Sequence, residues 1–283
     1  MSVREVALVT HTHPDQTGDA VTSALAAAKG AGIEVVVTES EASKHGELLA
    51  GCRRVERMPD HPDLCLALGG DGTLLQALRH YADTGVPVFG INYGTIGFLA
   101  AVERDRLDEG LERAFSGDFE TVELPGLVTR LEIDHPVALN DISFIRKPHG
   151  RVAELSYSLG GQEIGHVRCD GLVAATPAGS TGYNLANQGP ILAWGVEGYV
   201  VSFIAPHTLT ARPLVVAPGD VLHVSNERGR ESVDIAFDGL PVAELESGEE
   251  LAVAFRDGAA SLAQLPDANF YERMREKFGR LAG

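Results

Sequence analysis

The sequence has few cysteines, and they are not spaced as a disulfide framework or a zinc site would require. Three cysteines occur in 283 residues, at positions 52, 65 and 169. The number is odd, and no two have paired metal-ligand spacing. Free thiols in a reducing compartment are therefore the simplest interpretation.

Long hydrophobic runs are also missing. No apolar stretch approaches the roughly 18 residues that suggest a membrane span. The short apolar run within residues 1–10 lacks the small-residue cleavage pattern of a secretory signal. Together with the unpaired cysteines, this predicts a cytoplasmic protein without a membrane partner.

Positive charge is scarce. The chain has 23 Lys and Arg against 40 Asp and Glu, a formal net charge of −17. Such a protein repels nucleic acid, and no basic cluster reverses the field locally. An anionic substrate such as a nucleotide would then have to be bound by local groups: backbone N–H donors, a metal ion or single arginines.

What is present is an ordinary globular composition, 44% hydrophobic and 22% charged, long enough for two domains. The first third alternates apolar runs with helical patterns, which is typical of βαβ units on a parallel sheet. We predict a Rossmann-like α/β domain over residues 1–105. Its expected strands are 6–9, 33–37, 64–68 and 87–91, and its expected helices are 20–29 and 73–82.

After a helix expected over residues 105–116, the pattern changes to short strands with turn signals, and the expected strands include 153–159, 199–204 and 251–255. Gly160 and Gly161 predict a hairpin turn. We predict a β-rich, sandwich-like domain over residues 106–260. The C-terminal segment, 261–283, is predicted to hold a helix capped by Asp267, whose apolar face (Phe270, Met274 and Phe278) docks on the first domain.

The strongest local feature is a glycine loop between a strand and a helix. Residues 69–73 read Gly-Gly-Asp-Gly-Thr and directly follow the apolar run 64–68. Glycines at such a turn let the backbone approach an anion, and the helix N-terminus adds free N–H donors. The loop matches neither the Walker pattern nor the dinucleotide fingerprint. Asp71 would be a base or act through a metal; the alternative is that it only caps the helix.

A second feature is the stretch 170–184, in which a strand enters a turn rich in Gly, Ser and Thr. Hydroxyl and backbone groups there can bind a ribose or a base, and Tyr183 offers a ring for stacking. Taken alone, the stretch could equally be a surface loop.

At these residues the chain resembles the NAD kinase family. The glycine loop 69–73, the segment 91–99, the pair Asn140 and Asp141, the signature 170–183 with 189–192, and the segment 206–213 occur in the family's order. The glycine loop alone also occurs in diacylglycerol kinase, sphingosine kinase and phosphofructokinase relatives, whereas the ordered set is specific.

The resemblance implies an N-terminal α/β domain and a β-rich C-terminal domain with the substrate between them. It implies phosphorylation of the 2′-hydroxyl on the adenosine ribose of NAD, with ATP as donor and a divalent metal, expected to be Mg²⁺. It also implies a homodimer or homotetramer. Most of phosphoryl transfer is positioning and charge neutralisation, which suits a single carboxylate base.

The resemblance also implies roles for individual residues. Asp71 would be the proton acceptor, and Phe98 would form a wall of the adenine site. The remaining expected contacts are Gly69, Gly70, Gly72 and Thr73 with phosphates, and Asp71, Gly72, Asn140, Asp141, Arg168, Asp170, Thr181, Gly182, Tyr183 and Ala186 with NAD. No residue is assigned as a metal ligand.

Four positions depart from the family pattern. Asp141 stands where Glu is usual, Gly182 where Ala is usual, Gln76 where a basic residue is frequent, and Leu240 where Gln is frequent. These departures leave open a kinase for a different nucleoside or dinucleotide. A lipid or sugar kinase with the same loop and a non-catalytic nucleotide sensor are further alternatives.

Overall fold

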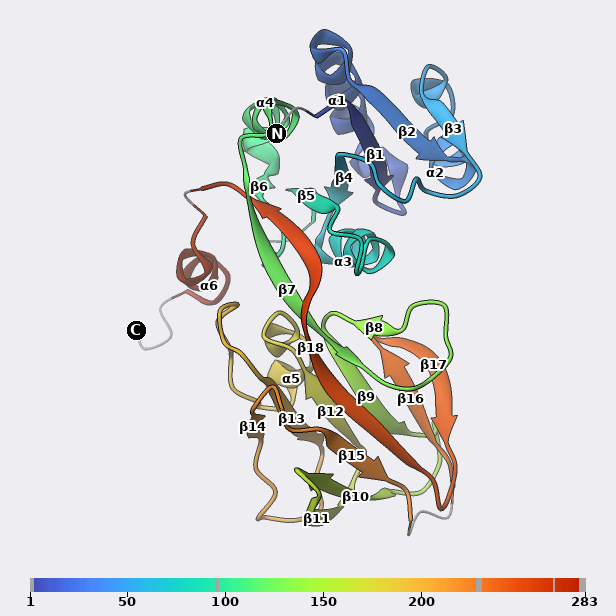
Figure 1. Cartoon of the computed structure of the whole chain (residues 1–283), viewed down its shortest axis with the longest axis vertical. Helices are drawn as coiled ribbons and strands as arrows, with labels where there is room; N and C mark the ends of the chain where they lie inside the picture. The colour runs from blue at the N-terminus through green and yellow to red at the C-terminus, as the bar shows by residue number, and fades with distance from the viewer. Residues whose placement is uncertain (1–2, 95–96, 228–230, 267, 280–283) are drawn as a thin grey trace. The chain divides into compact units, whose positions relative to one another are not determined.

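The computed structural model describes residues 3–94, 97–227, 231–266 and 268–279, which form two compact units (Figure 1). The first unit comprises Met1–Glu123 and Ala260–Gly283, and the second Leu124–Ala259. Within the described part, no helix is long and apolar enough to cross a membrane.

The first unit is built on a parallel sheet in the order β3-β2-β1-β4-β5-β18. Its apolar strands are buried on both faces, as expected for a parallel sheet covered by helices. The strands are β1 (Glu5–Thr10), β2 (Glu34–Thr38), β3 (Arg53–Val55), β4 (Leu64–Gly69), β5 (Pro87–Asn92), β6 (Val102–Glu103) and the end of β18 (Glu250–Gln264).

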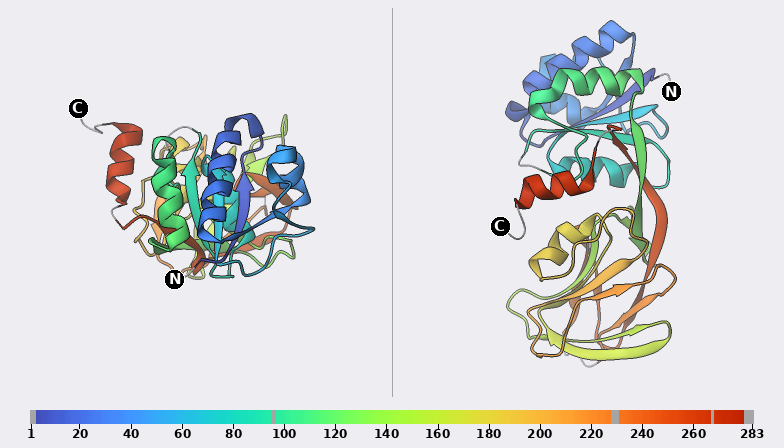
Figure 2. Two further views of the ribbon diagram at one scale, coloured as in Figure 1. Left: turned by 90° about the horizontal axis from the view of Figure 1, so that it is seen from above. Right: turned by 90° about the vertical axis from the view of Figure 1, so that its left-hand side faces the viewer.

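Helices cover both faces of this sheet. Helix α1 (Gly18–Ala31) and helix α4 (Leu107–Ser116) lie side by side in Figure 2 and share one apolar core. Helix α3 (Asp71–His80) packs on β5, where a Cβ at Gly90 would lie 2.1 Å from Leu74 Cδ2. The remaining helical segments are η1 (Pro14–Gln16), α2 (Glu39–His45), η2 (Gly46–Leu49), η3 (Arg104–Arg106) and α6 (Phe270–Phe278).

The second unit is a sandwich of antiparallel sheets around one core. One sheet has the order β14-β13-β12-β9-β16-β17, and the other contains β11, β10, β15 and β18, with β7 beside β18 and β8 beside β7. Their bounds are β7 (Glu120–Val128), β8 (Val137–Ala138), β9 (Asp141–Arg146), β10 (Ala153–Leu159), β11 (Gln162–Cys169), β12 (Gly171–Ala175), β13 (Tyr199–Ile204), β14 (Leu214–Val216), β15 (Leu222–Ser225), β16 (Val233–Phe237) and β17 (Leu240–Leu245). Two short helical segments, η4 (Gly179–Thr181) and α5 (Tyr183–Ala186), follow β12.

The fold class predicted from the sequence is confirmed: an α/β domain with a parallel sheet, then a β-rich sandwich, with a C-terminal helix returning to the first unit. The hairpin turn between β10 and β11 has positive φ at both Gly160 and Gly161, as expected. The first compact unit, however, extends to Glu123 and not to residue 105, because α4 packs on α1.

The C-terminal segment also differs in detail from the expectation. Strand β18 continues to Gln264 and pairs in parallel with β5, whereas the apolar pattern suggested an end at residue 255. Asp267, the expected cap, lies outside the described residues. Asn269 caps α6 instead, since its side chain accepts a hydrogen bond from the Tyr271 N–H at 2.9 Å.

Candidate functional site

The glycine loop stands at the carboxyl end of β4, where ligands bind in open α/β sheets. Gly69 is the last residue of β4 and Gly70 the extended N-cap of α3. Gly72 is exposed, and no atom lies within 4 Å of a Cβ built on it. The first N–H groups of an α-helix have no partner within the helix. This loop therefore offers backbone donors to an anion without side chains in the way.

Asp71 is the first residue of α3, but its carboxylate does not cap that helix. It turns to a segment 27 residues downstream and accepts hydrogen bonds from the N–H groups of Phe98, at 2.9 Å, and Leu99, at 3.1 Å. A carboxylate has about four lone-pair sites. The two donors thus fix the direction of the carboxylate and leave capacity for another proton.

Gly97 makes this contact possible. A Cβ built on Gly97 would lie 2.2 Å from Asp71 Oδ1, far inside van der Waals contact. Any larger residue would push the Asp71 carboxylate away from the Phe98 and Leu99 amides. The glycine before Phe98 is thus required by the position of the carboxylate.

The loop after β5 lies against the glycine loop. The Tyr93 N–H donates to the Gly69 carbonyl at 3.1 Å, and a Cβ on Gly94 would lie 3.2 Å from the Gly70 Cα. Asn92 shapes this loop: its Oδ1 accepts from the Gly94 N–H at 2.9 Å, and its Nδ2 donates to Glu103 at 2.7 Å. Thr95 and Ile96 of the same segment lie outside the described residues. Two neighbouring strands therefore end in loops that form one surface.

Phe98, the expected wall of the adenine site, packs against the C-terminal helix α6. Its side chain is buried, and the rings of Phe270 and Phe278 lie 5.9 and 5.7 Å from it between centroids. Lys277 Nζ lies 4.6 Å above the same ring. The predicted docking of the C-terminal helix on the first unit is confirmed, and Phe98 is the residue that it covers.

In the second unit, Asn140 and Asp141 lie at the start of β9 around the carboxylate of Asp238. Asp238 has φ +49° and accepts hydrogen bonds from the N–H groups of Leu139, Asn140 and Asp141, at 3.2, 2.6 and 3.2 Å. Sequence reasoning did not identify Asp238 as a site residue. Its only signal was an Asp-Gly pair in a β-rich region.

Asp141 is a buried carboxyl group, only 5% exposed. Burial, followed by the negative charge of Asp238, raises the pKa of Asp141 to about 7. Within the described structure, its Oδ1 has no hydrogen-bond partner. Because buried polar atoms are nearly always satisfied, this oxygen is suited to a polar group of a ligand.

The turn after β12 packs against Asn140. Thr176 donates its hydroxyl to the Leu139 carbonyl at 2.6 Å, and its N–H donates to the Asn140 carbonyl at 2.9 Å. A Cβ on Gly179 would lie 2.0 Å from Asn140 O, so only glycine fits there. The structure therefore brings together two motifs that the sequence separates by more than thirty residues.

Tyr183, at the start of α5, is 36% exposed, and an exposed aromatic ring can stack on a base. Burial raises the pKa of the Tyr183 hydroxyl, and the charges of Asp141 and Asp170 add to the rise, so the three groups share one neighbourhood. Of the other expected NAD contacts in this turn, Gly182 and Ala186 are exposed and Thr181 is half-buried.

Arg168 and Asp170 each form an ion pair with another residue of the second unit. Arg168 Nε lies 3.4 Å from Glu154 Oε1, and Asp170 Oδ1 accepts from Arg146 Nε at 2.6 Å. Arg146, Arg151 and Arg168 line one cavity of about 610 Å³ in the second unit. Sequence reasoning singled out Arg168 and missed the other two arginines, which carry no motif of their own.

Gln76 and Leu240, two of the positions that depart from the family pattern, are both exposed. Gln76 lies on α3 and Leu240 at the start of β17.

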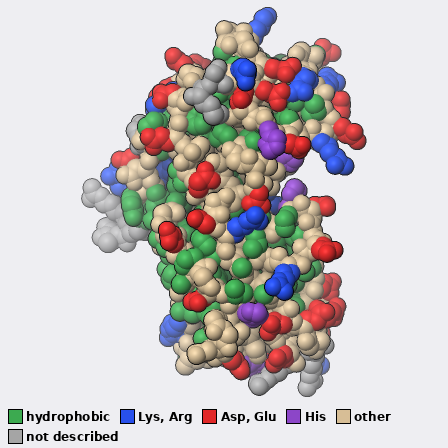
Figure 3. All heavy atoms as spheres, in the orientation of Figure 1, with side chains coloured by type: hydrophobic (Ala, Val, Ile, Leu, Met, Phe, Trp, Pro, Cys, Tyr) green, Lys and Arg blue, Asp and Glu red, His purple; other side chains and the backbone are tan. Residues whose placement is uncertain are grey.

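The described residues contain no group of three or more His, Cys, Asp or Glu that could hold a metal ion. On the face shown in Figure 3, acidic side chains are spread widely, with basic ones interspersed.

Comparison with known proteins gives a consistent result. Residues 12–119 match the ATP-NAD kinase N-terminal domain, and residues 139–265 match the ATP-NAD kinase C-terminal domain. An NAD kinase of Geotalea daltonii is 32% identical over 85% of this chain and 86% of its own length. An NAD kinase of Natranaerobius thermophilus is 30% identical over 97% of this chain and 98% of its own length.

Two solved structures share the fold. Yeast NADH kinase complexed with NADH superposes with a TM-score of 0.85 at 20% identity, covering 100% of this chain and 89% of its own. An NAD kinase from Archaeoglobus fulgidus in complex with ATP superposes with a TM-score of 0.71 at 22% identity, covering 97% of both chains. With the matched domains and the identities above, these findings show that the chain belongs to the NAD kinase family.

Proposed function

We propose that this NAD kinase transfers the γ-phosphoryl group of ATP to the 2′-hydroxyl on the adenosine ribose of NAD, giving NADP and ADP. The ribose oxygen forms a bond to the γ-phosphorus as the bond between that phosphorus and the β,γ-bridging oxygen breaks. The proton of the hydroxyl passes to Asp71. The observation that carries the proposal is the Asp71 carboxylate, aimed by two main-chain amides beside a glycine loop.

The glycine loop would bind phosphates. Gly69, Gly70, Gly72 and Thr73 lie at the N-terminus of α3, where free N–H groups and the helix dipole favour negative charge. With a chain of net charge −17, such local donors are the means by which a triphosphate is held. Thr73 is buried, so its contribution would come from the backbone.

NAD would be bound by the groups around Asp141 in the second unit, together with Asp71 and Gly72. The unpartnered Oδ1 of Asp141 suits a polar group of the adenine nucleoside, and the exposed ring of Tyr183 suits a base. Asn140, Asp170, Thr181, Gly182 and Ala186 would surround them, and the Arg168 cavity would take an anionic part of the dinucleotide. Phe98, buried under α6, would support Asp71 through its N–H and would not contact adenine as it lies here.

We propose that Mg²⁺ is the metal ion, although the described residues form no metal cage of their own. This fits Mg²⁺, which is usually bound through substrate phosphates, waters and one or two carboxylates. Asp71 is the carboxylate beside the glycine loop. When bound, the ion neutralises phosphate charge. We further propose that the enzyme works in the cytoplasm. We also propose that it is a homodimer or homotetramer, and light scattering of the purified protein tests this oligomeric state.

The test is a product assay with ATP, Mg²⁺ and a panel of acceptors, comparing wild type with Asp71→Asn. We expect NADP from NAD, and a fall in kcat by a factor of about 10² or more in Asp71→Asn, with the Kd for NAD little changed. Asp134→Asn, which removes an exposed carboxylate in the second unit, is the control. Wild-type turnover in Asp71→Asn would refute the base.

The acceptor panel also tests the substrate. A preference for another nucleoside or dinucleotide would show that the shorter Asp141 and the smaller Gly182 have redirected the site. NAD binding without any phosphorylated product would identify a nucleotide sensor.

A further inference from the structure

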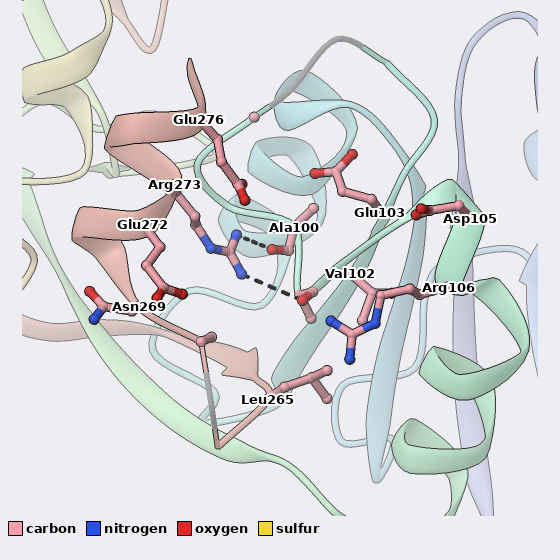
Figure 4. Close-up of a pocket in the computed structure, with 13 residues that line it drawn as sticks. Ala100, Val102, Glu103, Asp105, Arg106, Leu265, Asn269, Glu272, Arg273 and Glu276 are labelled. Atoms are coloured by element: carbon pink, nitrogen blue, oxygen red, sulfur yellow. Dashed lines mark hydrogen bonds between the residues drawn. The ribbon is translucent and has the colours of Figure 1, made fainter. Parts of the chain in front are cut away.

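The segment that holds Asp71 is itself held from its carbonyl side by two residues near the end of the chain. Arg273, on α6, donates through Nη1 to the Phe98 carbonyl at 2.9 Å. The same nitrogen also donates to the Ala100 carbonyl (Figure 4). Gln264, the last residue of β18, donates through Nε2 to the Leu99 carbonyl at 2.8 Å. The two side chains also contact each other, since Arg273 Nη2 donates to Gln264 Oε1. Three consecutive carbonyls are therefore bound by one connected pair.

The same residues face Asp71 with their N–H groups. Phe98 and Leu99 donate their amides to the Asp71 carboxylate and have their carbonyls bound by Arg273 and Gln264. A peptide plane is rigid and contains the carbonyl of one residue together with the N–H of the next, so the hydrogen bond from Arg273 to the Phe98 carbonyl also fixes the direction of the Leu99 N–H. The orientation of the Asp71 carboxylate thus depends on residues more than 160 positions further along the chain.

The environment of Arg273 shows why it stays in place. Arg273 and Ala100, one of the residues whose carbonyl it binds, line a pocket of about 320 Å³ together with Glu103, Glu272 and Glu276 (Figure 4). Burial lowers the pKa of Arg273, and the charges of Glu103, Asp71 and Glu276 oppose that change. The Asp71 charge therefore lies within electrostatic reach. Helix α6 already has an apolar contact with the first unit through Phe270 and Phe278, so docking alone does not require the arginine.

We propose that Arg273, together with Gln264, is a positioning residue for the catalytic base: it holds the main chain of residues 98–100 so that two amides aim the Asp71 carboxylate. The inference rests on the proposed role of Asp71. It assigns to the C-terminal helix a part in the reaction, although none of its residues need touch substrate.

The first experiment compares Arg273→Met, Arg273→Lys and Gln264→Leu with wild type in steady-state kinetics. We expect Arg273→Met to lower kcat by about tenfold or more, because a displacement of about 1 Å at a reacting group has effects of this size. The KM for NAD should change by less than about threefold, since the arginine would not bind substrate. Arg273→Lys, which keeps one charged donor, should fall between the two. Arg275→Met, an exposed arginine on the same helix, is the matched control and should keep wild-type kcat.

The second experiment repeats Arg273→Met in the Asp71→Asn background. If Arg273 acts through Asp71, the second substitution lowers the residual turnover little further, because coupled residues are not additive. Equal factors in both backgrounds would overturn the inference and leave only a structural role. So would unchanged kcat in Arg273→Met.

Three further outcomes are distinguishable. If Arg273→Met does not fold, Gln264→Leu and Arg273→Lys decide the matter, and wild-type kcat in both would refute the positioning role. If Asp71→Asn itself retains wild-type turnover, the proposed base is wrong and this inference falls with it. A loss in Asp71→Asn without a loss in the Arg273 and Gln264 variants would refute the inference alone.

Discussion

Replacing Asp141 by Asn should make the stability of the protein less sensitive to pH. Burial and the nearby charge of Asp238 raise the pKa of Asp141 from 3.8 to about 7 in the folded protein. In the unfolded chain an aspartate titrates near 4. Between these two values the folded state binds the proton that the unfolded state has released, so the free energy of unfolding falls as pH rises. The loss is absent below about pH 4 and is complete slightly above pH 7.

The magnitude follows from the same two values. Each pKa unit corresponds to about 1.4 kcal/mol, so a rise from 3.8 to about 7 corresponds to about 4 kcal/mol at full ionisation. Roughly 2 to 3 kcal/mol of this develops between pH 5 and pH 8. Asn has nearly the same shape and does not ionise in this range, so the variant lacks this contribution at every pH.

The assay is urea unfolding followed by circular dichroism at pH 5 and pH 8. Other groups also titrate, so the informative quantity is the variant minus the wild type at each pH. We expect this difference to move in favour of Asp141→Asn by about 2 to 3 kcal/mol from pH 5 to pH 8. Asp134→Asn reports the effect of losing an exposed carboxylate in the same unit. A difference that is equal at both pH values would contradict the reasoning, because it would mean that Asp141 is already ionised at pH 5.

The remaining predictions concern both units. Gly97→Ala should lower kcat at least about tenfold, because its methyl would displace the Asp71 carboxylate. Gly51→Ala is the control and should keep wild-type kcat, since no atom lies within 4 Å of a Cβ at that position. Equal kcat values in the two variants would argue against the contact between Gly97 and Asp71. Asp238→Ala should lower the free energy of unfolding by about 2 to 4 kcal/mol, since three backbone N–H groups lose their acceptor, and an unchanged melting temperature would count against this. Tyr183→Ala should raise the Kd for NAD about tenfold by calorimetry while Tyr183→Phe leaves it unchanged; the stacking role fails if both variants bind alike.

Local sequence patterns were sufficient for much of the fold. Strands β10 and β13 have the bounds that their apolar patterns predict, and the two glycines between β10 and β11 form the expected turn. Helix α2 was missed because its seven residues are mostly polar and show no apolar stripe. The end of β18 was missed because Asp257 and Gly258 interrupt the pattern before the strand reaches β5.

The sequence by itself determined the family, the order of the motifs and the chemical type of the groups at the site. These features depend on residue identity and on spacing within one strand, loop or helix. Only the tertiary structure decided which groups meet: Asp71 with Phe98, Asp238 with Asn140, and Arg273 with Phe98 at a separation of 175 residues. The physical reason is that each of these carboxylates and guanidinium groups binds backbone amides or carbonyls. Every residue carries those groups, so no side-chain pattern marks the partner, and only the order and register of the strands bring it within hydrogen-bonding distance.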